Sequence, residues 1–314
     1  MGRWKRWCAC TLAMIAASIA LAAPVVAADA LPHVEMGRVE RLANFASRFV
    51  DARNVDVWLP PGYDKRRRYD VLYMQDGQGV FDPAITWNKQ AWRLDAALGR
   101  LIAEHKVAPV IVVAIWNNGK YRFSEYFPQK FLAHLDAPVR DKFVADTLQN
   151  EPRSDAYLKF IVEELKPYID AHYATLPMRE HTFLMGSSMG GMISVYAMNE
   201  YPQIFGGAAA LSIHWAGKLE PNYEIPLAAF NYLHAHLASP LGHRLYMDHG
   251  TAGLDAWYAP YQLFIDQIVA GHGYGTDNWQ SRVFEGATHA ETDWGSRVAI
   301  PLEFLLPKPA QDRR

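Results

Sequence analysis

The chain contains very little cysteine. Of its 314 residues only two are cysteine, Cys8 and Cys10, and both fall within the first ten positions. A chain cleaved behind this segment would contain no thiol, which excludes disulfides, a thiolate nucleophile and cysteine-ligated metal. A chain of this length buries enough apolar surface to fold without disulfides.

The sequence also lacks an excess of basic charge. It contains 31 Lys and Arg and 33 Asp and Glu, which gives a formal net charge of −2. Nucleic-acid binding needs a basic surface, so we expect no nucleic-acid partner. His234 and His236 form a His-x-His pair, but no third ligand is placed beside them. We therefore expect no metal and no cofactor.

Long apolar runs are missing outside the first 30 residues. There, three basic residues within the first six positions precede an apolar run at 8–23, and residues 24–30 end in Ala-Asp-Ala. This three-part pattern is typical of a secretory signal peptide. The alternative is an uncleaved anchor, but the run is shorter than the ~20 residues of a spanning helix. We predict cleavage after Ala30 or Ala27 and a periplasmic or secreted protein without a stable membrane anchor.

Internal repeats, low-complexity tracts and Pro/Ser linkers are absent as well, so residues 31–314 are predicted to form a single domain. Residues 55–59 alternate like a half-buried strand, whereas later apolar runs do not alternate and suit strands buried on both faces of a parallel sheet. These later strands are predicted at 71–74, 109–115, 182–185, 207–211, 244–247 and 279–284. Helical periodicity falls between them, at 90–104, 155–173, 190–201, 260–271 and 290–306. The alternation predicts an α/β fold with helices on both faces of the sheet. Residues 215–241 have no clear period, and we expect a lid or an excursion over the site.

The most informative stretch is Gly186-Ser-Ser188-Met-Gly190, which lies between a predicted buried strand and a helix. Gly-x-Ser-x-Gly in this context is typical of a nucleophile elbow, because larger side chains two residues either side of the serine would collide with neighbouring chain. Ser188 is the predicted nucleophile, since Ser187 occupies the wrong position in the motif. The alternative is a glycine-rich turn with an idle serine.

A serine nucleophile needs a histidine base and an orienting carboxylate, which follow it in the order acid then histidine. His289 is the predicted base because it follows the last predicted strand, at the same sheet edge as the elbow. Two carboxylates follow the strand at 244–247. Asp248 is expected at the strand's end and Asp255 further out in the loop, with the reach to curl back over the sheet edge, so Asp255 is the predicted acid and Asp248 the alternative.

Together these motifs resemble the esterase family of α/β-hydrolases that contains esterase D, enterochelin-esterase-like proteins, feruloyl and acetylxylan esterase domains, and the mycolyltransferases of the antigen 85 group. The resemblance runs from about Val55 to Leu306 and implies an α/β-hydrolase fold. Its marks are Tyr73-Met-Gln-Asp-Gly-Gln78, Phe81-Asp82, Trp92, Asn117, Arg122, Glu125-Tyr126, Glu164-Leu-Lys-Pro-Tyr-Ile-Asp170, Gly186-Ser-Ser-Met-Gly-Gly191, Gly286-Ala-Thr-His-Ala-Glu291 and Trp294.

The resemblance implies that the turn at Asp76-Gly77-Gln78 supplies half of an oxyanion hole, formed by the backbone N–H groups of Gln78 and Met189. Asn117, Arg122 and Glu125 are then expected to brace loops rather than to react.

The predicted function is that of a serine carboxylic-ester hydrolase acting on a small-molecule or carbohydrate-linked ester, such as an acetyl or feruloyl ester. Three alternatives stay open: an acyltransferase with the same residues, a siderophore-ester hydrolase, and a non-catalytic binding protein on the same scaffold.

Overall fold

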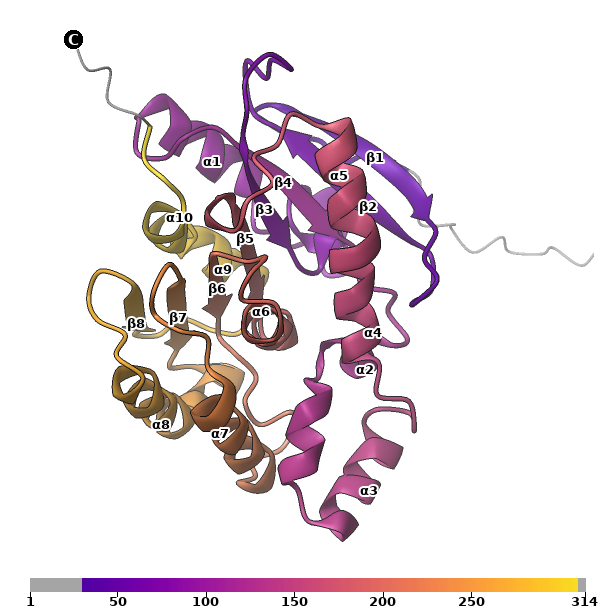
Figure 1. Ribbon diagram of the computed structural model, residues 1–314, viewed down its shortest axis with the longest axis vertical. Coiled ribbons are helices and arrows are strands. Elements are labelled where there is room, and N and C mark those ends of the chain that lie inside the picture. The colour runs from indigo at the N-terminus through magenta and orange to yellow at the C-terminus, as the bar shows by residue number, and fades with distance from the viewer. Residues whose placement is uncertain (1–29, 310–314) are drawn as a thin grey trace, which may run out of the picture. The chain divides into compact units, whose positions relative to one another are not determined.

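An eight-stranded sheet runs through residues 30–309, the part of the chain that the computed structural model describes (Figure 1). The strands lie in the order β1-β2-β4-β3-β5-β6-β7-β8. Their bounds are β1 Arg38–Phe45, β2 Arg53–Leu59, β3 Asp70–Met74, β4 Val110–Ile115, β5 Thr182–Ser187, β6 Gly207–Leu211, β7 Arg244–Gly250 and β8 Trp279–Phe284. β2 pairs antiparallel with β1 and β4, and every other pair is parallel. The mostly parallel α/β sheet is therefore confirmed, while the predicted signal peptide lies outside the described residues except for its last residue, Ala30.

The central strands are buried along their whole length. β3, β4, β5 and β6 expose no residue, as expected of parallel strands covered on both faces. The prediction of a half-buried alternating strand at Val55–Leu59 is wrong, because all five residues are buried. The polar member of the alternation, Asp56, is buried in a hydrogen-bonded ion pair with Arg41 of β1, a strand that the sequence pattern did not indicate.

Helices cover both faces of the sheet (Figure 1). One buried cluster packs α4 to α8 against one face, and a second packs α1 and α10 against the other. The helix bounds are α1 Leu94–Ala103, α2 Arg122–Tyr126, α3 Ala137–Asp146, α4 Ser154–Lys159, α5 Lys166–His172, α6 Met189–Glu200, α7 Glu224–His236, α8 Tyr258–Gly271, α9 Glu291–Arg297 and α10 Ala299–Leu305. The described residues 31–309 belong to one compact unit.

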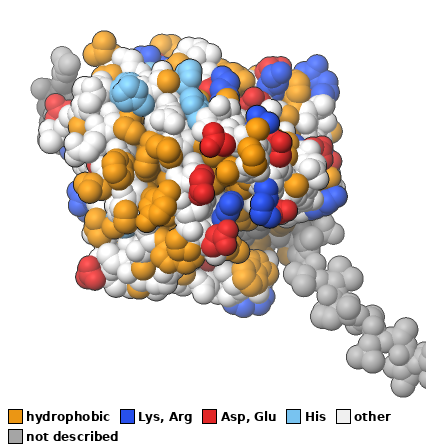
Figure 2. Space-filling view, turned by 90° about the horizontal axis from the view of Figure 1, so that it is seen from below, with side chains coloured by type: hydrophobic (Ala, Val, Ile, Leu, Met, Phe, Trp, Pro, Cys, Tyr) orange, Lys and Arg blue, Asp and Glu red, His pale blue; other side chains and the backbone are white. Residues whose placement is uncertain are grey.

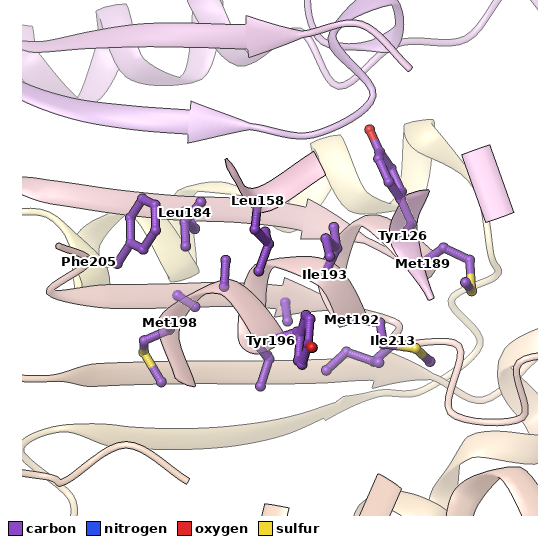
Figure 3. Packing of buried hydrophobic residues seen from close by; sticks show 14 of the residues in the cluster. Tyr126, Leu158, Leu184, Met189, Met192, Ile193, Tyr196, Met198, Phe205 and Ile213 are labelled. Atoms are coloured by element: carbon purple, nitrogen blue, oxygen red, sulfur yellow. The ribbon is translucent and has the colours of Figure 1, made fainter. Parts of the chain in front are cut away.

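Helix α6 is buried on nearly its whole circumference, which fixes the strand-to-helix turn that precedes it. Figure 3 shows Ile193 and Tyr196 of this helix packed among side chains of the neighbouring strands and helices. Met189, its first residue, lies at the same end of the cluster as Tyr126 of α2. A turn anchored by so much apolar contact can hold a strained backbone conformation.

Two predicted helical regions differ in detail from the structure. The run at 155–173 is divided, because six residues with π-type hydrogen bonding, Phe160–Leu165, separate α4 from α5. Pro167 has no N–H to continue an α-helical ladder, which fits a local change of hydrogen bonding there. The run at 290–306 forms two helices, α9 and α10, that meet at Val298.

The segment at 215–241 contains a regular helix, α7, that its sequence pattern did not predict. Figure 2 shows hydrophobic side chains gathered on one half of the face formed below the sheet by α7 and α8, with charged side chains toward the α3 half. The exposed large hydrophobic residues in this region are Leu219, Tyr223, Leu227, Leu263 and Phe264. α7 thus has apolar residues on two sides, which erases the one-sided pattern used to recognise surface helices. Within residues 30–309 no helix combines the length and hydrophobicity needed to cross a membrane.

Candidate active site

The residues singled out from the sequence follow the carboxyl ends of neighbouring strands. Ser188 follows β5, the Asp76–Gln78 turn follows β3, Asp255 follows β7 and His289 follows β8. Parallel strands end at one edge of the sheet, so the topology brings these four segments to a common edge, where ligands bind in open α/β folds.

Ser188 has a strained backbone. Its φ of 57° and ψ of −126° are rarely adopted by a residue with a side chain, and it stands immediately before the first residue of α6. Its N–H donates to the carbonyl of Leu211 at 2.9 Å, tying the elbow to the end of β6. The sharp strand-to-helix turn predicted from the sequence is therefore present. Within residues 30–309 the Ser188 hydroxyl makes no hydrogen bond, and the residue as a whole is 9% exposed.

Glycine is required at both flanking positions of the elbow, because a Cβ at either one would be too close to neighbouring atoms. A Cβ on Gly186 would lie 2.6 Å from the carbonyl of Gly190. A Cβ on Gly190 would lie 3.0 Å from both Gln75 Cβ and Asp76 Oδ2. The same contacts show that the turn after β3 lies directly against the first turn of α6.

The turn after β3 contains a left-handed residue, Asp76, with φ 54°. Gly77 is required because a Cβ there would lie 2.5 Å from the carbonyl oxygen of Ala114. Among the described residues, the backbone N–H groups of Gln78 and Met189 donate to no acceptor. Both groups are thus free to bind an anion at this edge.

Asp76 is held in place by two side chains. Its carboxylate accepts from Nε and Nη2 of Arg122 at 2.7 and 2.8 Å and from Nδ2 of Asn117 at 2.6 Å. Such a bidentate pair fixes orientation as well as charge. Glu125 pairs with Arg53 deep in the structure, at 2.7 Å between Oε1 and Nη2. Asn117 and Arg122 thus hold the turn after β3, whereas Glu125 joins α2 to the first residue of β2.

Asp255 and His289 are in direct contact. Nδ1 of the imidazole lies 2.6 Å from Oδ1 of the carboxylate, and Asp255 is fully buried. The two loops are tied together by backbone bonds, since Thr251 and Ala252 both donate to the carbonyl of Ala287 at 3.1 and 3.0 Å. Burial alone would raise the pKa of Asp255, but hydrogen bonds from His289 and Ser212 hold that pKa below its usual value. An ionised Asp255 stabilises the tautomer of His289 that carries its proton on Nδ1.

Asp248 has a different partner. The expectation that it ends the strand is wrong, because β7 continues to Gly250. Asp248 is therefore an interior strand residue, and its carboxylate pairs with the Arg297 guanidinium, with Nη2 3.0 Å from Oδ1. Burial raises the pKa of Asp248, although Arg297 opposes this.

Three ring systems surround His289. The rings of Trp294, Tyr258 and His214 lie edge-on to it, with centroids at 5.0, 5.8 and 6.4 Å. Nδ1 of His214 lies 2.7 Å from the Tyr258 hydroxyl. Burial, together with the nearby His289 ring, lowers the pKa of His214 to about 4, so this imidazole is neutral at pH 7.

The sequence did not indicate Ser212 or Arg297, which both belong to this cluster. Ser212 Oγ donates to Asp255 Oδ2 at 2.5 Å, and Arg297 Nη2 donates to Ser212 Oγ at 3.1 Å. A signal for Ser212 existed, because it directly follows β6 at the edge where ligands bind. Arg297 lies within the last helical stretch, and nothing in its neighbourhood of the sequence marks it.

Within residues 30–309 no group of three or more His, Asp or Glu is placed to hold a metal ion. His234 and His236 lie near the end of α7, and the ring of His234 lies edge-on to that of His272, with centroids 6.0 Å apart.

Comparison with known proteins assigns the chain to a family. Residues 46–297 match the model of the family described as "Putative esterase". The chain belongs to this family. The resemblance expected from the motifs is thereby confirmed. A curated relative, an endo-1,4-beta-xylanase/feruloyl esterase of Xylanibacter ruminicola, is 25% identical over 189 residues, or 57% of this chain. This chain spans only 22% of that relative's length.

Solved structures show the same fold. An enterobactin esterase from Shigella flexneri superposes with a TM-score of 0.63 at 15% identity, over 87% of this chain and 60% of that one. A ferulic acid esterase superposes with a TM-score of 0.62 at 19% identity, over 86% and 98% of the two chains. The predicted α/β-hydrolase fold is therefore confirmed.

Proposed function

We propose that this chain is an exported serine esterase that hydrolyses carboxylic esters through an acyl-enzyme on Ser188. The observation that carries the proposal is the 2.6 Å hydrogen bond between His289 Nδ1 and Asp255 Oδ1 at the sheet edge that holds the strained Ser188. An imidazole oriented by a buried carboxylate presents Nε2 as a general base, which a serine hydroxyl needs in order to react at neutral pH.

In the proposed first step, His289 Nε2 removes the Ser188 proton as Oγ attacks the ester carbonyl carbon. The negative charge that develops on the carbonyl oxygen faces the backbone N–H groups of Gln78 and Met189. Each donor of this kind contributes about 3 kcal/mol or more to lowering the barrier. The alcohol leaves with the proton held by His289. Water, deprotonated by the same nitrogen, then attacks the acyl-enzyme. The acid is released as the acyl–Oγ bond breaks and Ser188 Oγ takes that proton back from His289.

A neutral ester is the proposed substrate class, with acetyl or feruloyl groups on carbohydrate as the leading examples. The basic side chains close to the site already have carboxylate partners: Arg122 binds Asp76, and Arg297 binds Asp248. A polyanionic siderophore ester would require unpaired cations around the pocket. The feruloyl esterase and ferulic acid esterase names among the similar proteins agree with an aryl ester.

Hydrolysis of p-nitrophenyl acetate and methyl ferulate by purified residues 31–314 tests the proposal. We expect Ser188→Ala and His289→Ala to abolish turnover, and Ser188→Ala to abolish labelling by a fluorophosphonate. Ser187→Ala is the matched control, because it removes the neighbouring hydroxyl at the end of β5 and should leave turnover intact. A wild-type protein that neither turns over these esters nor reacts with the probe contradicts the proposal. Acylated sugar in place of free acid, when sugars are supplied, indicates an acyltransferase.

Export is proposed from the signal-peptide pattern of residues 1–30. Expression of the full chain in a Gram-negative host, followed by osmotic release and N-terminal sequencing, should give a periplasmic protein that begins after Ala30 or Ala27. Recovery of full-length chain in the membrane fraction would show an uncleaved anchor instead.

A further inference from the structure

Ser212 occupies an unusual position at the end of β6. Its backbone is left-handed, with φ 46°, and its side chain is fully buried. Its N–H donates to the carbonyl of Asp248 at 2.7 Å, which ties it to β7. A non-glycine residue held in this conformation indicates that its surroundings require the side chain there.

Among the described neighbours of the Ser212 hydroxyl, only one can accept its proton. A serine hydroxyl has one hydrogen and two lone pairs. Nε1 of Trp294 at 3.0 Å and Nη2 of Arg297 at 3.1 Å both point at the oxygen. An indole and a guanidinium donate and never accept, so they occupy the lone pairs. The remaining contact is Oδ2 of Asp255 at 2.5 Å, which must receive the Ser212 proton.

Arg297 is itself fixed. Its Nη2 and Nε lie 3.0 and 3.2 Å from Oδ1 and Oδ2 of Asp248, and both residues are buried. The guanidinium carbon also lies 5.0 Å from the centre of the Phe284 ring. Asp248 supplies the charge that lets Arg297 remain buried, and Arg297 in turn keeps Ser212 in its donating orientation.

We propose that Ser212 is a positioning residue that fixes the Asp255 carboxylate and, through it, the ring of His289. This inference rests on the proposed function. Ser212 and the backbone N–H of Gly250, at 2.7 Å, together occupy Oδ2. Oδ1 is thereby left facing His289.

The donated hydrogen bond also withdraws negative charge from the Asp255 carboxylate, which then stabilises an imidazolium less strongly. Three other titratable groups interact with this pair: His214 after β6, Tyr258 of α8 and Asp293 of α9. The buried Asp248–Arg297 ion pair reaches it only through Ser212 among the described residues.

The test is the pH profile of kcat/KM for p-nitrophenyl acetate in wild type, Ser212→Ala and Arg297→Lys. In Ser212→Ala we expect the acid limb to move upward by about half a pH unit, and kcat to fall about tenfold, because one hydrogen bond to a charged group is lost. Arg297→Lys keeps the charge beside Asp248 but loses the fork to Ser212, so it should move the limb in the same direction by less. Ser124→Ala is the control, because it removes a buried hydroxyl whose one hydrogen bond within residues 30–309 is to the carbonyl of Leu148.

An unmoved acid limb in both variants, with a lower Tm alone, would make Ser212 a packing residue and overturn the inference. The rate of fluorophosphonate labelling, measured over the same pH range, reports Ser188 activation in the folded fraction if Ser212→Ala expresses poorly. Turnover that survives Ser188→Ala in the parent chain contradicts the proposed function instead, and removes the basis for the inference with it.

Discussion

Asp248 and Arg297 form a buried ion pair in which Nη2 lies 3.0 Å from Oδ1. Asp248 and Asp255, the first two aspartates that follow Met247 in the sequence, therefore have different partners. Asp248 points toward the helix layer that contains α9 and neutralises a buried cation there. Asp255, seven positions later, faces His289 at 2.6 Å. We therefore expect different effects when each aspartate loses its charge: loss of activity for Asp255 and loss of stability for Asp248.

Replacing Asp255 by asparagine should nearly eliminate catalysis while leaving the fold intact. The amide favours the wrong tautomer of His289, and the loss in kcat for such a change is about 10⁴-fold. Steady-state hydrolysis of p-nitrophenyl acetate, on protein whose circular dichroism matches wild type, measures this. A kcat near that of wild type would show that another carboxylate orients the histidine.

Replacing Asp248 by asparagine should act mainly on stability. An uncompensated buried Arg297 costs about 3 kcal/mol or more in the free energy of unfolding. Urea denaturation of wild type and variant gives that difference directly. The folded fraction should retain far more activity than Asp255→Asn does, since the contact between Asp255 and His289 remains. The reverse ranking of the two variants in kcat would identify Asp248 as the acid.

The parts of the site that could be predicted from sequence are those with a local cause. The elbow is encoded by contacts within a few residues, as between Gly186 and Gly190, and so is visible as a spacing. His289 could be predicted because it follows the last strand, and strand order fixes which edge it reaches. Asp255 required only that a loop after β7 be long enough to return over the sheet.

Other features depend on partners distant in sequence. Ser212 and Trp294 are 82 positions apart, and no periodicity relates them. The full burial of β2 could not be predicted, because the strand contains the charged residue Asp56. Burial of this carboxylate is tolerated because it pairs with Arg41 on β1. The direction in which Asp248 points depends on how far β7 extends, and a strand that continues through Asp-His-Gly shows no apolar signal for those residues.

We expect the strained backbone at Ser188 to lower the stability of the folded protein. Its φ of 57° and ψ of −126° suit glycine, which lacks the Cβ that makes this region costly. We expect Ser188→Gly to be more stable than Ser188→Ala by about 1 kcal/mol after allowing for the greater entropy of glycine in the unfolded chain. Both variants should be inactive. Thermal unfolding of the pair isolates backbone strain from loss of the hydroxyl, and equal Tm values would show that the turn stores no strain.

Arg122 should affect turnover through Asp76 rather than by touching substrate. Removing the bidentate contact in Arg122→Gln frees Asp76, whose left-handed backbone sets the direction of the Gln78 N–H. A misdirected donor in the proposed oxyanion site lowers kcat, and we expect a loss of about 10-fold or more with KM little changed. Arg140→Gln, on the exposed surface of α3, is the matched control. A rise in KM at constant kcat would instead assign Arg122 to substrate binding.

His214 should make the stability of the protein depend on pH below neutrality. Burial lowers its pKa to about 4 in the folded protein, whereas the unfolded chain takes up the proton near pH 6.5. Between these values the unfolded state binds more protons than the folded state, so stability falls as pH falls through this window, by about 3 kcal/mol in total. His214→Gln does not titrate there and can still bond Tyr258. Its free energy of unfolding, measured in urea at several pH values, should therefore vary less than that of wild type from pH 6.5 down to about 4. His134→Gln removes an exposed imidazole and serves as the control. Parallel curves for wild type and His214→Gln would mean that the buried imidazole accepts a proton as readily as one in the unfolded chain.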